Sequence, residues 1–587
     1  MTSNDLPNRF DEAKIQELLL TDTLSTQSDS ACVLDADVFI AGTGPVGAAY
    51  ARIILDAKPD AKVIMADIGS QENSVVGAHF KNSVKYQKDI DLFVNVIKGA
   101  LQAISIPPED TFISNLGGQG WKPSIGGDKT LIFQGNNPQQ KRELNLKASA
   151  VTRTVGGMAT HWTCACPIPH EDERKQNPIE WNQLRGLLYT ARKKLLKVDS
   201  HQFDNSVRHT VVKKALIAHI DSARVKNLPL AVKRRKDNPH FVTWSATDTV
   251  FGNTVNKLQL LAEHRVTKVV GVKTAPGDVK GVLLRDLKED KDRVVRAKAI
   301  ILCCGAVPTP QILFNSGITD QTLPALGHYL CEQSLTFCQI ALKHEYIDAI
   351  PTKDPFHDFK HSKEAILKHL AKYKSDPLPI PFSDPEPQVT LPYSRKYPWH
   401  VQIHRDAFNY GEVGPRADSR VVVDLRWFGA QESKKDNYVT FGGTTDIYGM
   451  PQATFNVKRS EKDEENDQKM MGDMTQVANV LGSYIPGSYP QFMEPGLVLH
   501  ITGTIRIGEN DQTSVADPES RVHGFKNLWV GGNGCIPDAT ACNPTSTSVA
   551  IAIKGARAVL RQLWPDLKAK LQKDEEEERK AGMEDQD

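Results

Sequence analysis

The stretch that decides the fold runs from Val33 to Gly47 and reads Val-Leu-Asp-Ala-Asp-Val-Phe-Ile-Ala-Gly42-Thr-Gly44-Pro-Val-Gly47. Its apolar first part predicts a buried strand, and residues 46–57 predict a helix. Between them, the motif G-x-G-x-x-G has the setting that a dinucleotide needs. Gly42 lets the chain turn, Gly44 lets backbone amides approach a pyrophosphate, and Gly47 lets the helix pack closely on the strand. An ordinary tight turn is the alternative.

A second strand is predicted for residues 61–66, and it ends in Asp67. An acidic residue about 20 positions after the glycine motif is where a ribose-binding carboxylate belongs in such a unit. The combination favours a dinucleotide over a simple turn. Further strands of the unit are predicted at residues 258–261, 264–270, 282–284, 294–304 and 528–530, with helices at 310–316 and 546–560.

The composition is that of an ordinary globular protein. The chain has 587 residues, 40% of them hydrophobic and 24% charged, with a formal net charge of +1. This length predicts several structural units, and so small a net charge gives no field that would attract nucleic acid or an anionic membrane. No apolar run reaches the roughly 18 residues of a transmembrane helix. Residues 1–30 lack the regions of a conventional signal peptide, so we expect a cytoplasmic location or an unconventional export route.

Nine cysteines are spread along the chain. An odd number in a long chain predicts no disulfide framework and agrees with a reducing compartment. Cys164, Cys166 and His170 lie in one short stretch and could be drawn as metal ligands. No matching second pair follows them, so we expect no metal site.

The stretch Thr152-Arg-Thr-Val-Gly-Gly-Met-Ala-Thr-His161-Trp-Thr-Cys164 is the second organising feature. Gly156 and Gly157 permit a tight backbone turn close to a ligand. Taken alone, a histidine beside a tryptophan is more often a packed structural residue than a reactive one. Next to a dinucleotide motif, His161 becomes a candidate for contact with the cofactor.

The stretch Gly305-Ala-Val-Pro-Thr-Pro-Gln-Ile-Leu-Phe-Asn-Ser-Gly-Ile318 resembles a signature of the glucose–methanol–choline (GMC) flavin oxidoreductases. The resemblance implies an α/β GMC-type fold, with a Rossmann-like FAD-binding domain and a substrate domain built on an antiparallel sheet. Residues 160–163, Thr-His-Trp-Thr, resemble the flavinylation segment of the pyranose oxidases, which implies a covalent bond from His161 to the 8α carbon of FAD. The resemblance assigns to cofactor binding Gly42, Gly44, Gly47, Asp67, Thr152, His161, Trp162, Thr163, Cys164, Val266 and Asn533.

Residues 499–508, Leu-His-Ile-Thr-Gly-Thr-Ile-Arg-Ile-Gly, and residues 531–544 resemble the C-terminal signature of the family. By this resemblance His500 is the catalytic histidine and Asn543 is its partner. Alcohol oxidation needs a base that takes the hydroxyl proton while hydride leaves the carbon, and an imidazole with a pKa near neutrality suits this role. Without the family, His500 has an equal claim to a structural role. His404 is the next candidate for the base.

Residues 407–415, Ala-Phe-Asn-Tyr-Gly-Glu-Val-Gly-Pro, resemble the substrate loop of the pyranose oxidases. Aromatic side chains beside polar ones suit a sugar ring, which has apolar faces and hydroxyl edges, and a solvated hairpin loop is the alternative. The resemblance assigns to substrate binding Gln402, Asp406, Phe408, Tyr410, Arg426, Val498, His500 and Asn543. The chain departs from the family pattern at Asn409, Ile505 and Ile507, positions that bear on sugar preference and subunit contacts.

These features indicate an FAD-dependent oxidase of aldopyranoses such as D-glucose. It would oxidise the C2 hydroxyl to a ketone and pass the electrons to dioxygen, forming hydrogen peroxide, or to quinones. The alternatives are a GMC dehydrogenase, a glycoside 3-oxidase and a non-catalytic flavin-binding protein. The resemblance also implies a homotetramer.

The predicted organisation is discontinuous. We expect a polar tail at residues 1–32, an FAD-binding domain at 33–80, 145–166, 257–330 and 520–565, and a substrate domain at 81–144, 167–256 and 331–519. The substrate domain would include an interface arm at about 105–133 and a surface subdomain at about 343–395, and residues 566–587 would be a frayed, charged tail. Other predicted elements are helices at 12–20, 90–104, 179–198, 211–227 and 363–373, a solvated basic loop at 233–236, and one antiparallel sheet from strands at 397–406, 420–428, 437–441 and 453–457.

Overall fold

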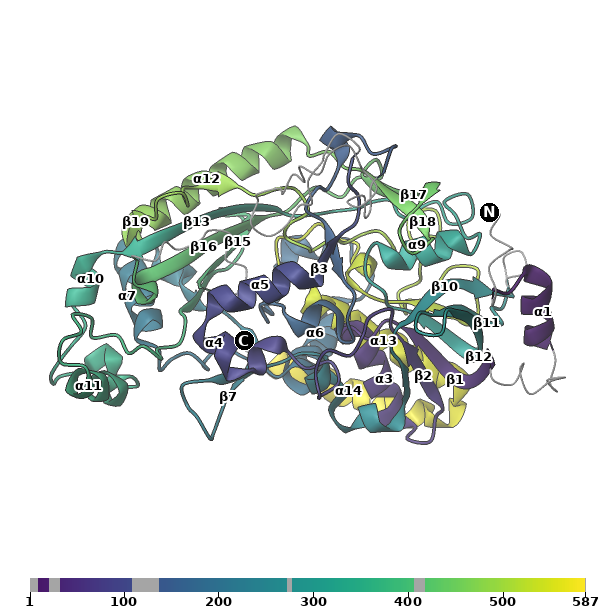
Figure 1. Ribbon diagram of the computed structural model, residues 1–587, viewed down its shortest axis with the longest axis horizontal. Helices are drawn as coiled ribbons and strands as arrows, with labels where there is room; N and C mark the ends of the chain where they lie inside the picture. Colours follow the sequence, from purple (N-terminus) through teal and green to yellow (C-terminus); the bar gives the residue numbers. More distant parts are fainter. Residues whose placement is uncertain (1–8, 21–31, 108–136, 272–276, 406–416, 586–587) are drawn as a thin grey trace.

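Two large β-sheets lie side by side along the long axis of the molecule (Figure 1). The computed structural model describes residues 9–20, 32–107, 137–271, 277–405 and 417–585. Most of the predicted interface arm and all of the predicted substrate loop at 407–415 therefore lie outside the described residues. Within those ranges, no helix has the length and apolar character needed to cross a membrane.

The first sheet has seven strands in the order β10-β11-β12-β1-β2-β9, with β21 paired to β12. Its centre is parallel: β1 pairs with β2 on one side and β12 on the other, and β21 also runs parallel to β12. The carboxyl ends of these strands therefore meet at one edge, which is where α/β sheets bind ligands. The strands are β1 (Val33–Ala41), β2 (Val63–Ala66), β9 (Gln259–Leu261), β10 (His264–Val270), β11 (Gly281–Asp286), β12 (Lys291–Leu302) and β21 (Leu528–Val530).

Helix α3 (Pro45–Ala57) starts directly after the glycine turn and packs against α13 (Thr545–Leu563) beside this sheet (Figure 1). The two helices approach closely because α13 has a glycine at the contact: a Cβ atom on Gly555 would lie 2.1 Å from the Tyr50 hydroxyl. That buried hydroxyl donates a hydrogen bond to the Val530 carbonyl at 3.3 Å. The predicted strand–turn–helix unit is confirmed, with the helix starting one residue earlier than expected.

The second sheet has seven strands in the order β19-β13-β16-β15-β14-β6, with β20 paired to β13. All these pairs are antiparallel. Helices α12 (Glu461–Leu481) and α7 (Val207–His219) pack against it through one apolar cluster. The strands are β6 (Lys226–Asn227), β13 (Ser334–Leu342), β14 (Gln388–Leu391), β15 (Trp399–His404), β16 (Val422–Gly429), β19 (Gly482–Tyr484) and β20 (Gln491–Phe492).

The four strands predicted between residues 397 and 457 are present, and the first two, β15 and β16, belong to the second sheet. The prediction that the last two join the same sheet is wrong. Strands β17 (Tyr438–Thr445) and β18 (Pro451–Asn456) form a separate two-stranded hairpin beside α9 (Pro308–Asn315) (Figure 1). The hairpin is bonded to the segment around Gly327. The Val439 amide donates to the Gly327 carbonyl at 2.9 Å, and the two backbones lie too close for a Cβ atom at position 327.

Three predicted helices end or begin elsewhere. Helix α5 (Ile90–Ala100) stops early because Leu101–Ala103 form β3, which pairs with β4 (Ala150–Thr152). Helix α7 starts four residues before the predicted Val211 because the Ser206 side chain caps it by accepting the His209 amide at 3.1 Å. Helix α6 (Trp181–Tyr189) continues as a π-helical segment to Leu196.

The basic run 233–236 is partly a strand, since β7 (Leu230–Arg234) joins β5 (Val198–Asp199) and β8 (Val242–Trp244) in a three-stranded sheet.

Inside the predicted surface subdomain lie α10 (His344–Asp348) and α11 (Lys363–Lys372), at one end of the molecule (Figure 1). The remaining short helices are α4 (Val84–Lys88) and α8 (Thr247–Phe251).

Both predicted tails contain packed helices. Helix α14 (Lys568–Glu584) lies on α6, where a Cβ atom on Gly582 would stand 2.7 Å from the Gly186 Cα, and Glu578 forms a buried ion pair with Arg557. The expectation of a frayed C-terminal tail is therefore wrong for residues 568–584.

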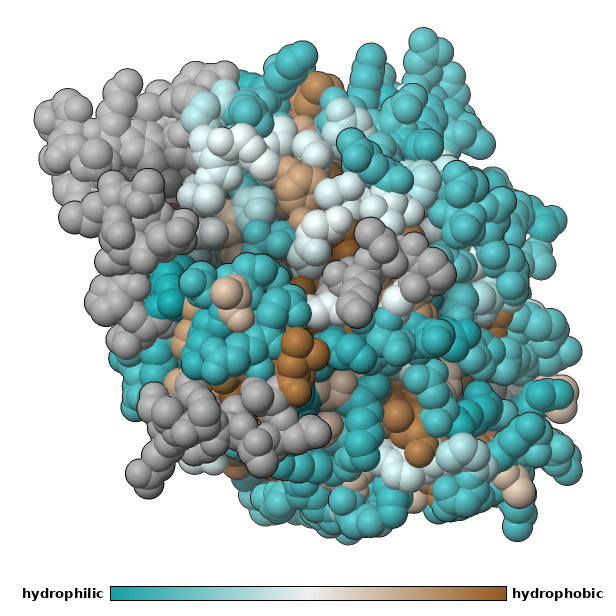
Figure 2. Space-filling model, turned by 90° about the vertical axis from the view of Figure 1, so that its right-hand side faces the viewer, coloured by the Kyte–Doolittle hydropathy of each residue, from teal (hydrophilic) through white to brown (hydrophobic). Residues whose placement is uncertain are grey.

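At the other end of the chain, α1 (Glu12–Leu20) buries Ile15 and Leu18 against the first sheet. The face seen from the side of α1 is otherwise mainly hydrophilic, with hydrophobic residues in small separate areas (Figure 2).

Candidate active site

A cavity of about 340 Å³ runs from the carboxyl edge of the first sheet to the inner face of the second. Most predicted site residues line it, although they come from distant parts of the chain. The predicted residues on its wall are Gly42, Gly44, Asp67, Thr152, His161, Trp162, Thr163, Val266, Gln402, Arg426, Val498, His500, Asn533 and Asn543. Gly47 and Cys164 do not line the cavity, and Asp406, Phe408 and Tyr410, like Asn409, lie outside the described residues.

The glycine turn forms one end of the cavity. Gly42 has a φ of +92°, and a Cβ atom there would lie 2.4 Å from the Cys303 carbonyl oxygen. Gly44 caps α3 without any side-chain hydrogen bond, and a Cβ atom on it would meet nothing within 4 Å. The first turn of α3 therefore has no side-chain cap, and Gly44, Pro45 and Val46 line the cavity, a position that suits a phosphate at a helix N-terminus.

Asp67 holds this turn in place. Its carboxylate accepts the Thr43 amide at 2.9 Å, the Thr43 hydroxyl at 2.5 Å and the Gly69 amide at 2.9 Å. Burial raises the pKa of Asp67, and these hydrogen bonds oppose the rise. A carboxylate offers about four acceptor positions, so one position remains for a ligand hydroxyl.

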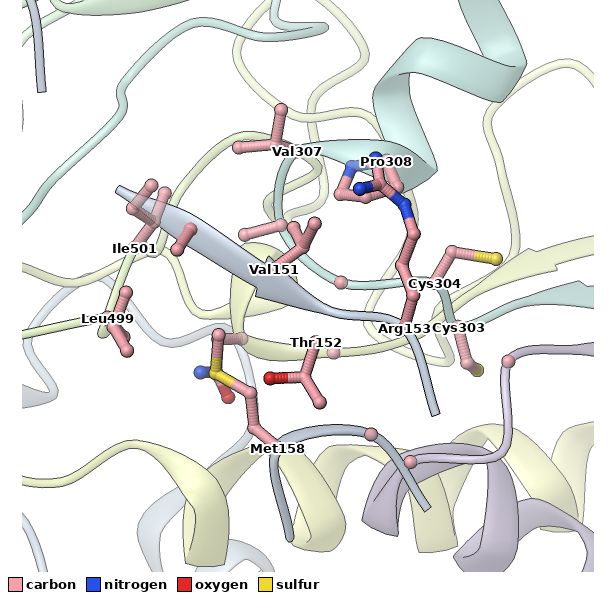
Figure 3. A pocket seen from close by; sticks show the side chains of 18 of the residues that line it. Val151, Thr152, Arg153, Met158, Cys303, Cys304, Val307, Pro308, Leu499 and Ile501 are labelled. Carbon is pink, nitrogen blue, oxygen red and sulfur yellow. The ribbon is translucent and has the colours of Figure 1, made fainter. Parts of the chain in front are cut away.

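The segment that carries His161 is interlocked with the turn. The Gly156 amide donates to the Thr43 hydroxyl at 2.8 Å, and His161 Nε2 lies 2.8 Å from the Thr152 hydroxyl. Within β4, Thr152 points to the side of Met158, while its neighbours Val151 and Arg153 point to the side of Val307 and Pro308 (Figure 3). Burial lowers the pKa of His161 to about 4, so its imidazole is neutral at ordinary pH.

Gly47 and Cys164, which do not line the cavity, contribute to packing and hydrogen bonding beside it. A Cβ atom on Gly47 would lie 2.1 Å from the Gly42 carbonyl oxygen, so glycine there allows the close packing of helix and turn. The Cys164 thiol donates to the Ser245 carbonyl at 3.3 Å, and the Trp162 indole donates to the same carbonyl at 2.8 Å. Ser245 thus anchors the chain on either side of Thr163.

The opposite end of the cavity carries His500 and Asn543. His500 Nε2 lies 3.3 Å from Asn543 Nδ2, and His500 Nδ1 lies 2.9 Å from Gln333 Oε1. Gln402 Nε2 donates to Asn543 Oδ1 at 2.7 Å. The protein packed around His500 lowers its pKa to about 3, below the near-neutral value expected for a base, so the ring is neutral at ordinary pH but binds a proton less readily than a free imidazole.

Arg426 is a buried cation on the wall near this pair. Its guanidinium donates to Asp424 at 3.4 Å, and Gln339 donates to the other oxygen of that carboxylate at 2.9 Å. Burial raises the pKa of Asp424 to about 6. His404, the alternative base, lies two residues beyond Gln402 on β15 and does not line the cavity.

Three buried residues around the pair have no signal in the sequence. Gln333 and Glu332 precede β13, and Glu332 accepts the His500 amide at 3.1 Å. Glu173 accepts the amides of Ala541 and Cys542 at 2.7 and 2.9 Å, and so holds the loop that leads to Asn543. A lone glutamine or glutamate before a strand matches no motif, so only tertiary contacts identify these residues.

A candidate group of metal ligands exists, but not the one drawn from the sequence. In the described part of the chain, ligand atoms of Glu173, His400 and Cys542 lie within 4.8 Å of one another, whereas Cys164, Cys166 and His170 form no such group. Hydrogen bonds from the 540–542 loop and the His170 amide already use both Glu173 oxygens. These bonds account for the burial of Glu173 without an ion.

Comparison with known proteins identifies one family for this chain. Residues 234–334 and 433–552 match family models described as GMC oxidoreductase. A pyranose 2-oxidase from Tricholoma matsutake is 54% identical, covering 95% of this chain and 100% of that protein. A pyranose 2-oxidase from Lyophyllum shimeji is 41% identical (90% and 92% coverage), and a C-glycoside 3-oxidase from Microbacterium trichothecenolyticum is 31% identical (90% and 98%).

Solved structures agree at the level of the fold. A formate oxidase structure from Aspergillus oryzae superposes with a TM-score of 0.62 at 14% identity, covering 91% of this chain and 99% of that one. Such a likeness shows a shared fold and no more. Together with the relatives that match along nearly the whole chain, it establishes that this protein belongs to the GMC oxidoreductase family, in the group that includes the pyranose 2-oxidases.

Proposed function

We propose that the protein is an FAD-dependent oxidase of aldopyranoses that oxidises the C2 hydroxyl to a ketone and passes the electrons to dioxygen or to quinones. The observation that carries this proposal is the neutral His500, paired with Asn543, at one end of a cavity whose other end is a dinucleotide turn. The 54% identical relative named pyranose 2-oxidase supports the sugar and the C2 position.

The residues on the cavity wall fit FAD. The uncapped N-terminus of α3 suits the pyrophosphate, and the remaining acceptor position of Asp67 suits a ribose hydroxyl. Arg265 also lines the cavity, and its buried Nε has no hydrogen-bond partner among the described residues. An unsatisfied buried donor is unfavourable by about 1–3 kcal/mol, which a bound acceptor would relieve.

The chemistry removes two electrons and two protons from the sugar as C2–OH becomes C2=O. When bound, the flavin ring supplies the acceptor for the hydride from C2. His500 takes the hydroxyl proton at Nε2, the nitrogen that faces Asn543, once the sugar hydroxyl has replaced the Asn543 contact there. Asn543 is a neutral amide and cannot act as a base, but its Nδ2 has a second hydrogen that can be donated to the sugar oxygen. The amide thereby orients the hydroxyl beside His500.

Oxidation at C3 is the second candidate, because a C-glycoside 3-oxidase is 31% identical over 90% of the chain. Incubation with D-glucose in air tests the two. We expect about one hydrogen peroxide per sugar consumed and a ketone at C2 in the NMR spectrum of the product. A C3 ketone, or turnover of glycosides alone, would favour the second candidate. A flavin-loaded protein that oxidises none of these sugars with dioxygen or a quinone would reject both.

A covalent bond between His161 and the 8α carbon of the flavin is the finer part of the cofactor proposal. His161 is buried, lines the cavity and is neutral, so it can use a nitrogen lone pair. The new N–C bond replaces one hydrogen on each atom, so two protons and two electrons leave; the electrons pass through the flavin to dioxygen.

Acid precipitation of the purified protein should therefore leave yellow flavin in the pellet. In His161→Ala the flavin should move to the supernatant, while His264→Ala, a second histidine on the cavity wall, should keep its flavin in the pellet. Release of intact flavin from fully loaded wild type would disprove the bond.

The role of His500 predicts a kinetic effect. His500→Ala should slow anaerobic flavin reduction by sugar about 10²–10⁴-fold, and Asn543→Ala should slow it less. The pKa of His500 is lowered to about 3, so its unprotonated form dominates above that pH. The wild-type rate of flavin reduction should therefore show no acid limb between about pH 5 and 8. Stopped-flow absorbance measures this step. A near wild-type rate in His500→Ala would move the role to another residue, with His404 tested next.

We also propose a homotetramer, on the basis of the family resemblance. Two apolar side chains, Leu92 on α5 and Phe492 on β20, are exposed, and each is next in sequence to a residue of one apolar cluster, Phe93 and Met493 respectively. Exposed apolar surface of this kind favours association. Light scattering should give a mass about four times the 65.0 kDa of the chain. A single species of one chain mass at micromolar concentration would contradict the proposal.

A further inference from the structure

The hydrogen bonds around Gln333 allow only one orientation of its side-chain amide. Its Nε2 donates to the backbone carbonyls of Thr540 and Cys542 at 2.7 and 3.0 Å. Carbonyl oxygens only accept, so the amide nitrogen must face them and Oε1 must face His500 Nδ1 at 2.9 Å. An amide oxygen also only accepts, so the hydrogen of this bond belongs to Nδ1. A neutral imidazole has one N–H, and Nε2 therefore carries the lone pair.

The other side of the ring agrees with this assignment. Asn543 Oδ1 accepts from Gln402, which turns Asn543 Nδ2, a donor, toward His500 Nε2. A donor facing Nε2 requires a lone pair there. The two amides on opposite sides of His500 thus demand the same tautomer, and the backbone carbonyls at 540 and 542 set it.

Resting on the proposed role of His500, we propose that Gln333 is a positioning residue that keeps the Nε2 lone pair of His500 toward the substrate and fixes the spacing between His500 and Asn543. Gln333 can do both because it bonds His500 with one end of its amide and the loop next to Asn543 with the other. Its side chain acts through His500 and is not assigned contact with the sugar.

The surroundings hold Gln333 in this orientation. The residue is 5% exposed, and its backbone N–H donates to the Glu332 carboxyl group at 2.7 Å. Glu332 also accepts the His500 amide at 3.1 Å, so one carboxyl group ties the two backbones together. On the far side, Glu173 holds Ala541 and Cys542. The carbonyls that orient Gln333 are therefore themselves fixed.

Three carboxyl groups near His500 and Asn543 have pKa values well above that of His500. Burial raises the pKa of Glu332 to about 8, that of Asp538 to about 7 and that of Asp424 to about 6. Burial alone lowers the pKa of His500. The other groups are Arg459 facing Glu332, Arg426 on the cavity wall, Glu173 and His400 beside the loop, and the thiols of Cys331 and Cys542. All of these residues are present in every Gln333 variant, and Gln333→Met adds no charge to them. Gln333→Glu adds a carboxyl group beside Glu332, so its pH profile is compared with that of Gln333→Met before a change is assigned to His500.

Two substitutions separate positioning from general packing. Gln333→Glu keeps an acceptor for Nδ1–H but removes the donor that faces the Thr540 and Cys542 carbonyls, so the new carboxyl group satisfies them only when protonated. Where it is ionised, its charge should raise the pKa of His500 by about one to three units. The acid limb of flavin reduction should then move up by the same amount. Gln333→Met removes the acceptor without adding charge, and reduction should slow by up to about 100-fold with no such movement of the limb. The matched control is Gln431→Met, a buried glutamine that accepts the Glu332 amide and does not touch His500.

The measurement is anaerobic stopped-flow reduction by D-glucose from pH 4 to 8, with flavin content and melting temperature checked for each variant. The proposal predicts a shifted limb in Gln333→Glu, a slower rate in Gln333→Met and a near wild-type rate in Gln431→Met. In the His500→Ala background, Gln333→Met should add much less loss than it causes in wild type, because only its hold on the loop next to Asn543 remains. A wild-type rate in Gln333→Met, or an equal further loss in the double variant, would overturn the proposal.

Nitrogen NMR of ¹⁵N-histidine-labelled protein gives a readout that needs no turnover and no anionic variant. Wild type should show His500 with hydrogen on Nδ1, and Gln333→Met, in which only the Asn543 amide still favours that tautomer, should show a mixture. If His500→Ala reduced its flavin normally, the base assignment would fail while this spectrum still decided the Gln333 proposal. Hydrogen on Nε2 in the wild type would refute it.

Discussion

Backbone contact at the glycine turn is the constraint on which the rest of the structure depends. A Cβ atom on Gly42 would lie 2.4 Å from the Cys303 carbonyl oxygen, and one on Gly47 would lie 2.1 Å from the Gly42 carbonyl oxygen. Only residues without a side chain let β1, β12 and α3 meet this closely. Because α3 then begins at the edge of the sheet, its uncapped amides open directly into the cavity.

Hydrogen bonds extend this constraint from the turn to the residues around it. The Thr43 hydroxyl donates to Asp67 and accepts the Gly156 amide, so the turn, the carboxylate and the segment that carries His161 are linked through one side chain. The cofactor end of the cavity therefore has its shape before any ligand enters. Such preorganisation reduces the ordering cost of binding.

The other end of the cavity uses neutral partners around a buried histidine. Burial lowers the pKa of His500 because imidazolium is poorly solvated there, and the amides of Gln333 and Asn543 add no negative charge that would offset the loss. A carboxylate in place of either amide would raise the pKa of the ring. Amide partners keep the ring neutral and fix its orientation, which is what the proposed role of His500 as the base requires.

Local pattern determined the βα unit, α9, α11 and α13, because glycine spacing, helical period and an early proline act within a few residues. The resemblance to the family added His500 and Asn543 as candidate site residues. They are 43 positions apart in the sequence, and the structure brings their side chains to 3.3 Å. Tertiary contact decided the β17–β18 hairpin, the strand at Leu101–Ala103 and the packed helix α14, where distant partners outweigh the local signal. It alone singles out Gln333, since a lone glutamine orients a histidine only after the chain brings the carbonyls of Thr540 and Cys542 to 2.7 and 3.0 Å from its amide.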